Sequence, residues 1–113
     1  MLKEAKLAMR ITGSAYDADI ADLLDAAASD LVTAGVELPG TVVFTMTNSG
    51  IVDSSTLTDK LVIRAMITYT RMHFGSPDDF DRLKEAYREQ KAMLMHAHSY
   101  TDYGDGGEDN GES

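Results

Sequence analysis

The stretch Leu57–Phe74, LTDKLVIRAMITYTRMHF, is apolar on nearly all sides when it is drawn as a helix. A helix of that kind is usually buried, and in a short chain it becomes the element on which the others pack. Thr58 or Asp59 is suited to cap its start. Gly75 and Pro77 end it, because glycine favours a left-handed C-terminal position and proline cannot continue the hydrogen-bond ladder. We therefore predict a central helix over this stretch.

A polar stripe interrupts this central helix. Its members are three or four residues apart and include three cations: Lys60, Arg64, Thr68 and Arg71. The stripe is consistent either with a solvated edge or with a contact between its cations and the acids of a neighbouring subunit. The second interpretation draws on the charge of the whole chain, whose formal net charge is −9 at pH 7.

Two helices are expected before the central one. Residues 2–10 form a short amphipathic pattern, and a longer helix is expected over about 15–34, with Ser14 and Asp17 as a capping box. The longer helix has an apolar stripe made of Ile20, Leu23, Leu24, Ala27, Leu31 and Ala34. Its opposite side carries Asp22, Asp25, Ser29 and Thr33, which we interpret most simply as a solvated face.

The sequence pattern between the second and the central helix changes from helical to strand-like. Residues 41–47, TVVFTMT, alternate and are rich in β-branched residues, while 48–50 form a turn signal and 51–53 can return as a second strand. An isolated hairpin is marginal in water, so it needs a helix beneath it or a neighbouring chain to pair with. We expect an outlying arm, about residues 36–56, whose contact side chains are Val42, Phe44 and Met46.

The C-terminal part divides into a helix and a tail. A last helix is expected over about 77–97, with Ser76 as its cap and Pro77 at its first position. Residues 99–113, SYTDYGDGGEDNGES, are Gly-rich and acidic and are expected to be extended and disordered alone. The expected fold is therefore mainly α: a small bundle of a short N-terminal helix and three main helices, with a β-hairpin or extended arm between the second and third helices. The domain spans 1–98, and 99–113 form an extended tail.

Composition excludes several classes of function. The chain has 113 residues, enough for one domain, and no cysteine, which excludes disulfides and thiolate metal sites. Charged residues interrupt the N-terminus, so we expect neither a signal peptide nor a membrane anchor. Tight sequence-independent binding to DNA needs clustered cations, and an acidic balance argues against it.

No catalytic or metal-binding pattern is present in the sequence. His96 and His98 are two residues apart and face different ways on a helix, while His73 is expected to be a packed or surface imidazole. The glycines of the tail follow no strand and precede no helix, so they do not form a phosphate loop. We expect no enzyme activity, no metal and no cofactor.

The order of parts resembles the small head–tail connector, or adaptor, proteins of long-tailed phages, also called head-completion or DNA-packaging proteins. The similarity rests on residues 9–12, MRIT, then 19–27, DIADLLDAA, then 61–69, LVIRAMITY, followed by 73–75, HFG, and the acidic start at 78–79. It covers about residues 1–98 and depends on order and spacing, not on a catalytic signature. Residues 36–56 and the tail lie outside it.

The resemblance implies a virion protein made in the host cytoplasm that forms a dodecameric ring under the portal. The implied partners are the portal, a stopper or tail-completion protein, and other copies of the chain. The resemblance also implies that DNA passes through the ring without specific binding and that no membrane is involved. On this interpretation Lys60, Arg64 and Arg71 contact a neighbour, together with the arm residues.

The resemblance to connector proteins also implies roles for two further sets of residues. Asp19, Asp22 and Asp25 would face the channel, where acids keep DNA sliding. The tail would contact the portal through Tyr100, Asp102, Tyr103 and Asp105, because aromatic side chains give large contact area at low entropic cost. The alternatives are a small acidic binding module or antitoxin-like regulator, and an assembly chaperone.

Overall fold

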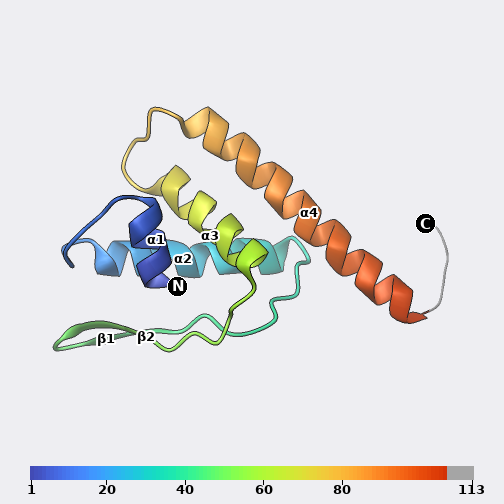
Figure 1. Ribbon diagram of the computed structural model, residues 1–113, viewed down its shortest axis with the longest axis horizontal. Coiled ribbons are helices and arrows are strands. Elements are labelled where there is room, and N and C mark those ends of the chain that lie inside the picture. Colours follow the sequence, from blue (N-terminus) through green and yellow to red (C-terminus); the bar gives the residue numbers. More distant parts are fainter. Residues whose placement is uncertain (107–113) are drawn as a thin grey trace.

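The described part of the chain is a helical bundle with one small hairpin. The computed structural model describes residues 1–106 (Figure 1). Its elements in order are α1 (Leu2–Ala8), α2 (Asp17–Thr33), β1 (Phe44–Thr47), β2 (Gly50–Asp53), α3 (Lys60–His73) and α4 (Phe80–Gly106). The expected helical fold, with a hairpin between the second and third helices, is confirmed. No helix among these residues is long and apolar enough to span a membrane.

Helix α3 is the centre of the packing, as predicted. It contacts α1, α2 and α4 (Figure 1). Asp59 caps it, since one carboxylate oxygen accepts hydrogen bonds from the backbone N–H groups of Leu61 (2.9 Å) and Val62 (3.1 Å). The helix ends at His73, and Gly75 adopts a left-handed φ of +67°. The helix is shorter than the predicted stretch because Asp59 takes the capping position and leaves Leu57 buried outside the helix.

The core lies between α2 and α3. Four predicted apolar positions on α2 are fully buried: Ile20, Leu24, Ala27 and Leu31. They belong to the same cluster as Val62, Ala65 and Met66 of α3. Each fully buried Leu or Ile contributes roughly 1.5–3 kcal/mol relative to an exposed one. The opposite side of α2 is exposed at Asp22, Asp25, Ser29 and Thr33, as expected.

One predicted capping box and one predicted helix start are wrong, although α2 begins within the predicted range from Ser14 to Asp17. Helix α2 begins at Asp17 after Tyr16, and no side chain caps it, so the Ser14 capping box does not form. Ser14 instead uses its carbonyl, which accepts a 3.2 Å hydrogen bond from the Asp17 N–H in a turn before the helix. Helix α4 begins at Phe80, later than the predicted Pro77, and the carbonyl of Asp79 accepts its first-turn hydrogen bond from Leu83 N–H.

Helix α1 is shorter than the predicted 2–10. It ends at Ala8, and Arg10 follows with a left-handed φ of +58°. That conformation is uncommon for a residue with a β-carbon. It reverses the chain, so that the N–H of Ile11 donates to the carbonyl of Lys6 (2.9 Å). The Lys6 ammonium lies 2.8 Å from the Asp17 carboxylate, which fixes the end of α1 against the start of α2.

The predicted hairpin forms, but its first strand is shorter than predicted and its second begins one residue earlier, at Gly50. Strands β1 and β2 are antiparallel, with Phe44 opposite Asp53 and Thr47 opposite Gly50. Gly50 has a φ of +120°, which glycine adopts without strain. Phe44 and Ile51 are partly buried against the core, so the inner face of the hairpin packs on the helices. The arm is therefore anchored along one face rather than wholly outlying.

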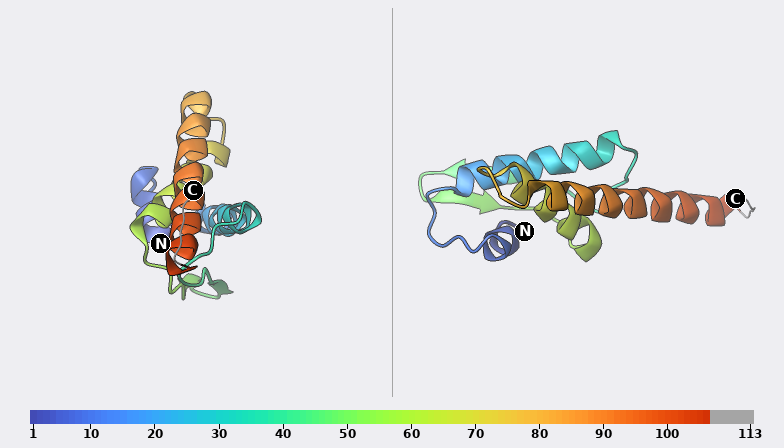
Figure 2. Two further views of the ribbon diagram at one scale, coloured as in Figure 1. Left: turned by 90° about the vertical axis from the view of Figure 1, so that its right-hand side faces the viewer. Right: turned by 90° about the horizontal axis from the view of Figure 1, so that it is seen from above.

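Helix α4 runs farther than predicted. It continues to Gly106, past the expected end near Ala97, so the first part of the predicted tail is helical. Adding a residue to an existing helix costs little compared with nucleation, and no proline lies between 98 and 106. Figure 2 shows the end of α4 projecting beyond the other helices. The rest of the predicted tail, residues 107–113, lies outside the described residues.

Candidate subunit interface

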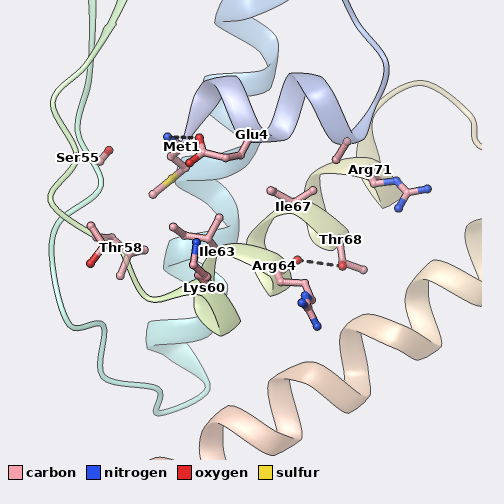
Figure 3. A pocket seen from close by; sticks show the side chains of 12 residues that line it. Met1, Glu4, Ser55, Thr58, Lys60, Ile63, Arg64, Ile67, Thr68 and Arg71 are labelled. Atoms are coloured by element: carbon pink, nitrogen blue, oxygen red, sulfur yellow. Dashed lines mark hydrogen bonds and ion pairs between the residues drawn. The ribbon is translucent and has the colours of Figure 1, made fainter.

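A groove runs along the outer side of α3. It lies between α3, helix α1 and the chain just before α3, and has a cavity volume of about 620 Å³ (Figure 3). We call it the basic groove; from α3 it is lined by Lys60, Ile63, Arg64, Ile67, Thr68 and Arg71. Their spacing of three or four residues places them on one side of the helix. The structure thus brings the predicted polar stripe together with an apolar strip.

The groove combines an apolar floor with a basic rim. The side chains of Ile63 and Ile67 point toward α1 (Figure 3). Thr68 is buried, and its hydroxyl donates a 3.0 Å hydrogen bond to the carbonyl of Arg64, so it does not offer a free polar group. Lys60 and Arg64 are exposed and Arg71 is half-buried. No ion pair to any of these three cations occurs within the described part of the chain.

The basic character extends past the end of α3. A smaller hollow of about 290 Å³ lies beside Phe74 and is lined by both Arg71 and Arg10. Arg10 reaches this place through its left-handed backbone after α1. The sequence pattern could not show this, because Arg10 and Arg71 are far apart in the chain and belong to different elements.

A second hollow of similar size carries the opposite charge. It has a volume of about 590 Å³, and we call it the acidic hollow; the residues used below are Tyr16, Asp19, Asp22, His73 and Phe74. The rings of Tyr16 and Phe74 meet edge to face, with centroids 5.4 Å apart and an interplanar angle of 87°. Tyr16 is 51% exposed, so an aromatic surface lies beside the aspartates. This aromatic component was not predicted from the sequence.

The aspartates of the acidic hollow continue along α2 as a stripe without cation partners. Asp19, Asp22 and Asp25 are all exposed, and within residues 1–96 none of them forms an ion pair. Partial desolvation and the charge of Asp22 together raise the pKa of Asp25. Like charges at this spacing repel, so a cation from outside the chain would relieve the stripe. We call Asp19, Asp22 and Asp25 the acidic stripe.

Asp30, also on α2, has a different role from the stripe. The Tyr87 hydroxyl donates a hydrogen bond to its carboxylate, and the Lys91 ammonium lies 3.2 Å from the same oxygen. The Tyr87 bond is the main cause that lowers the pKa of Asp30, while burial and Asp30 raise the pKa of Tyr87. Lys91 also lies 5.1 Å from the centre of the Tyr87 ring. Asp30 therefore joins α2 to α4 and is not part of the acidic stripe.

The base of the hairpin is fixed by one carboxylate. Asp53 accepts hydrogen bonds from the backbone N–H groups of Leu2 (3.1 Å) and Ser55 (3.0 Å), and lies 3.0 Å from the Met1 ammonium. That ammonium is also 2.7 Å from Glu4. Partial burial alone would raise the pKa of Asp53, but hydrogen bonds from the Ser55 side chain and these backbone groups, together with the ammonium, lower it to about 2. We call this arrangement the Asp53 anchor.

The predicted arm contacts differ in their exposure. Val42 and Phe44 are partly buried and pack against the core of their own chain. Met46 is 68% exposed near the hairpin turn, and Val43 and Val52 are also exposed. Of the three predicted contact residues, only Met46 offers most of its side chain to a partner. Whether any of them meets a neighbour stays a prediction.

The predicted portal-contact residues lie on α4, and the histidines lie on α3 and α4. Tyr100, Asp102, Tyr103 and Asp105 fall within the last turns of the helix, where side-chain positions are outside the described part of the structure. His96 is exposed, and His73 lines the acidic hollow. No cluster of three or more metal-ligating side chains occurs among the described residues.

Comparison with known proteins yields one match. Residues 1–101 match the family described as phage connector protein. Comparisons with curated proteins and with solved structures give no match. The matched region contains the basic groove, the acidic stripe and the hairpin, and it covers most of the chain. The chain therefore belongs to the phage connector protein family.

Proposed function

We propose that this chain is the subunit of a ring that sits beneath the portal, extends the DNA channel and offers a docking surface to the stopper or tail-completion protein. Membership of the connector family gives the coarser role, a structural virion component at the head–tail connection that meets other phage head or tail proteins. The ring, taken as a dodecamer, and the named partners are the proposal.

One observation supports the proposed ring above all others. The chain has two hollows of similar volume, one lined mainly by cations and the other by carboxylates. The carboxylate that also lines the groove, Glu4, pairs with the Met1 ammonium, and the groove cations and the stripe aspartates form no ion pair within the described residues. A ring of identical subunits with head-to-tail contacts needs two different, complementary surfaces on each subunit. The basic groove and the acidic hollow with its stripe supply such a pair.

The proposed role is purely structural, without catalysis or a cofactor. With a net charge of −9, the chain is poorly suited to gripping phosphates along a channel. DNA would pass through the ring without specific binding. The docking surfaces for the portal and the stopper would lie on the two ends of the ring, where α4 and the hairpin project.

The experiment uses the full-length chain and heads that carry the portal. Size-exclusion chromatography with light scattering should give a closed oligomer, and co-sedimentation should show the chain bound to portal-bearing heads but not to empty shells without portal. A monomer that ignores such heads would contradict the connector role and favour the alternative of a small binding module.

The predicted portal contact of the tail is tested by two truncations. Ending the chain after Gly106 removes only the segment outside the described helix, whereas ending it after His98 also removes the projecting turns of α4. Loss of head binding with the second truncation alone would assign the portal contact to α4. Unchanged binding by both truncated chains would show that the portal contact lies elsewhere.

A further inference from the structure

We propose that the basic groove of one copy takes the acidic stripe of a second copy, with Arg64 and Arg71 against Asp19, Asp22 and Asp25. In this contact one guanidinium enters the acidic hollow beside Tyr16 and Phe74. The inference rests on the proposed ring and names the contact that builds it.

The two surfaces do not pair within one chain. Arg71 lines the groove and His73 lines the acidic hollow. These residues are two positions apart on α3, which turns them about 200° from each other around the helix axis. The stripe is also on the side of α2 away from the buried residues that face α3. A second copy must therefore supply the partner, and the contact joins two different surfaces.

The spacing of the charges matches along the two helices. Arg64 and Arg71 are seven residues apart, or about 10.5 Å along α3 at 1.5 Å per residue. Asp19 and Asp25 are six residues apart, or about 9 Å along α2, with Asp22 between them. At 100° per residue, Asp22 lies midway, with Asp19 and Asp25 about 60° to either side of it around α2. The long arginine side chains of a helix lying alongside Asp22 can therefore reach carboxylates on both sides of it.

The chemistry of the acidic hollow favours a guanidinium. Arginine forms charge-assisted hydrogen bonds with carboxylates and also stacks on aromatic faces. The hollow offers Asp19 and Asp22 next to the Tyr16–Phe74 pair, of which Tyr16 is half-exposed. A metal ion would not use the aromatic surface, and an apolar segment would leave the carboxylates unpaired.

The shape of α2 allows a close approach. Its outer side has small residues on either side of the acidic stripe: Ala18 before it and Ala26 and Ser29 after it, of which Ala18 and Ser29 are exposed. Small side chains let a second helix come near, so the apolar strip of Ile63 and Ile67 can be covered as the charges pair. The contact thus combines apolar burial with complementary charge.

The proposed contact conflicts with one expectation from the sequence, namely that Asp19, Asp22 and Asp25 face the DNA channel. Side chains that meet the neighbour's arginines are covered at a subunit boundary and cannot also line the channel. The stripe would then determine assembly, and the channel lining would come from other parts of the subunit. The two roles for Asp19, Asp22 and Asp25 predict different results in the following experiment.

The experiment reverses each charge set and then combines them. The groove variant is Arg64→Glu with Arg71→Glu, and the stripe variant is Asp22→Arg with Asp25→Arg, which spares the first turn of α2. Matched controls on the exposed side of α4 are Lys84→Glu with Arg88→Glu, and Glu85→Arg with Glu89→Arg. Circular dichroism and thermal melting check that every variant is folded, and sedimentation equilibrium at low ionic strength measures self-association.

Each variant alone should raise the dissociation constant for self-association by about tenfold or more, while the controls leave it near the wild-type value. In a mixture of the two variants, the groove of each variant meets a stripe of opposite charge on the other, so the mixture should form rings of alternating variants although neither variant assembles alone. The chain with all four reversals should assemble again. Association of the wild type should weaken as salt is added.

Several results would overturn the proposed contact. These are wild-type-like association of either variant, no recovery in the fourfold variant, or a monomeric wild type at every concentration. Rings that form normally with the groove variant and still bind portal-bearing heads would refute the contact and leave the connector role intact. Loss of head binding by a chain whose rings form normally would instead count against the connector role.

Discussion

Replacing Asp53 by Asn should destabilise the fold in a way that depends on pH. The Asp53 anchor ties β2 to the start of α1 and to Ser55 through bonds that need a negative carboxylate. Its pKa falls from an ordinary 3.8 to about 2. Because each tenfold change in proton affinity corresponds to about 1.4 kcal/mol, the ionised carboxylate contributes roughly 2 kcal/mol to stability.

The sign of the pH dependence follows from the lowered pKa. The contribution is fully present above about pH 5, where the carboxyl is ionised in both the folded and the unfolded chain. It is lost as the pH falls toward 2, where the folded chain also takes up the proton. Asn cannot be ionised at any pH. The wild type and the variant should therefore differ by roughly 2 kcal/mol at neutral pH and converge near pH 2.

Urea denaturation followed by circular dichroism measures this difference at several pH values. Asp78→Asn, at an exposed position outside the helices, is the matched control and should change little. Amide exchange of β1 and β2 should also speed up in Asp53→Asn, because the base of the hairpin is released. A loss of stability that stays the same from pH 7 to pH 2 would refute the electrostatic explanation and point to packing instead.

Three other substitutions test local features of the fold. Gly40→Ala should cost about 1–3 kcal/mol in urea denaturation, because the new β-carbon would lie 2.7 Å from the α-carbon of the buried Leu57; a neutral result would mean that this loop shifts freely. Asp59→Ala should cost about 1 kcal/mol and fray the start of α3, seen as faster amide exchange there, unless another group takes over as cap. Tyr87→Phe should cost about 1–2 kcal/mol by removing the donor to Asp30, and should raise the pKa of that carboxyl in NMR titration; an unchanged pKa would contradict the assigned bond.

The main helices were predictable because their signals are periodic. On α2, apolar side chains recur every three or four residues, and the positions predicted to be buried or exposed are largely so in the structure. On α3, the three predicted cations mark the rim of the basic groove beside α1, whereas Thr68 in the same stripe is buried. The cap at Asp59 was predictable as well, because a capping carboxylate acts on backbone groups only two or three residues away.

The two wrong caps show where local patterns fail. Serine favours the capping position, but Ser14 does not cap α2 and α4 begins four residues after Ser76. Lys6 of α1 pairs with Asp17, the first residue of α2. A single-sequence pattern cannot rank a local cap against an ion pair from another element.

The candidate interface was only half predictable for the same reason. The cations of the basic groove lie on one helix, so their spacing revealed them. The acidic hollow needs Tyr16 before α2 and Phe74 after α3, which are brought together only by packing. The Asp53 anchor joins residues 51 positions apart and left no periodic signal.

The cations of the basic groove should matter for assembly but hardly for the stability of a single chain. The exposed Arg64 and the half-buried Arg71 have no ion-pair partner among the described residues, so their charges add little to the stability of a single chain, since even paired surface charges contribute about 0–1 kcal/mol. Reversing Arg64 and Arg71 should therefore leave the melting temperature of the monomer nearly unchanged. The side chains of the core, such as Leu24 and Met66, behave differently because each is fully buried within the chain. A surface whose charges matter for association but not for folding is what an interface between separately folded subunits requires.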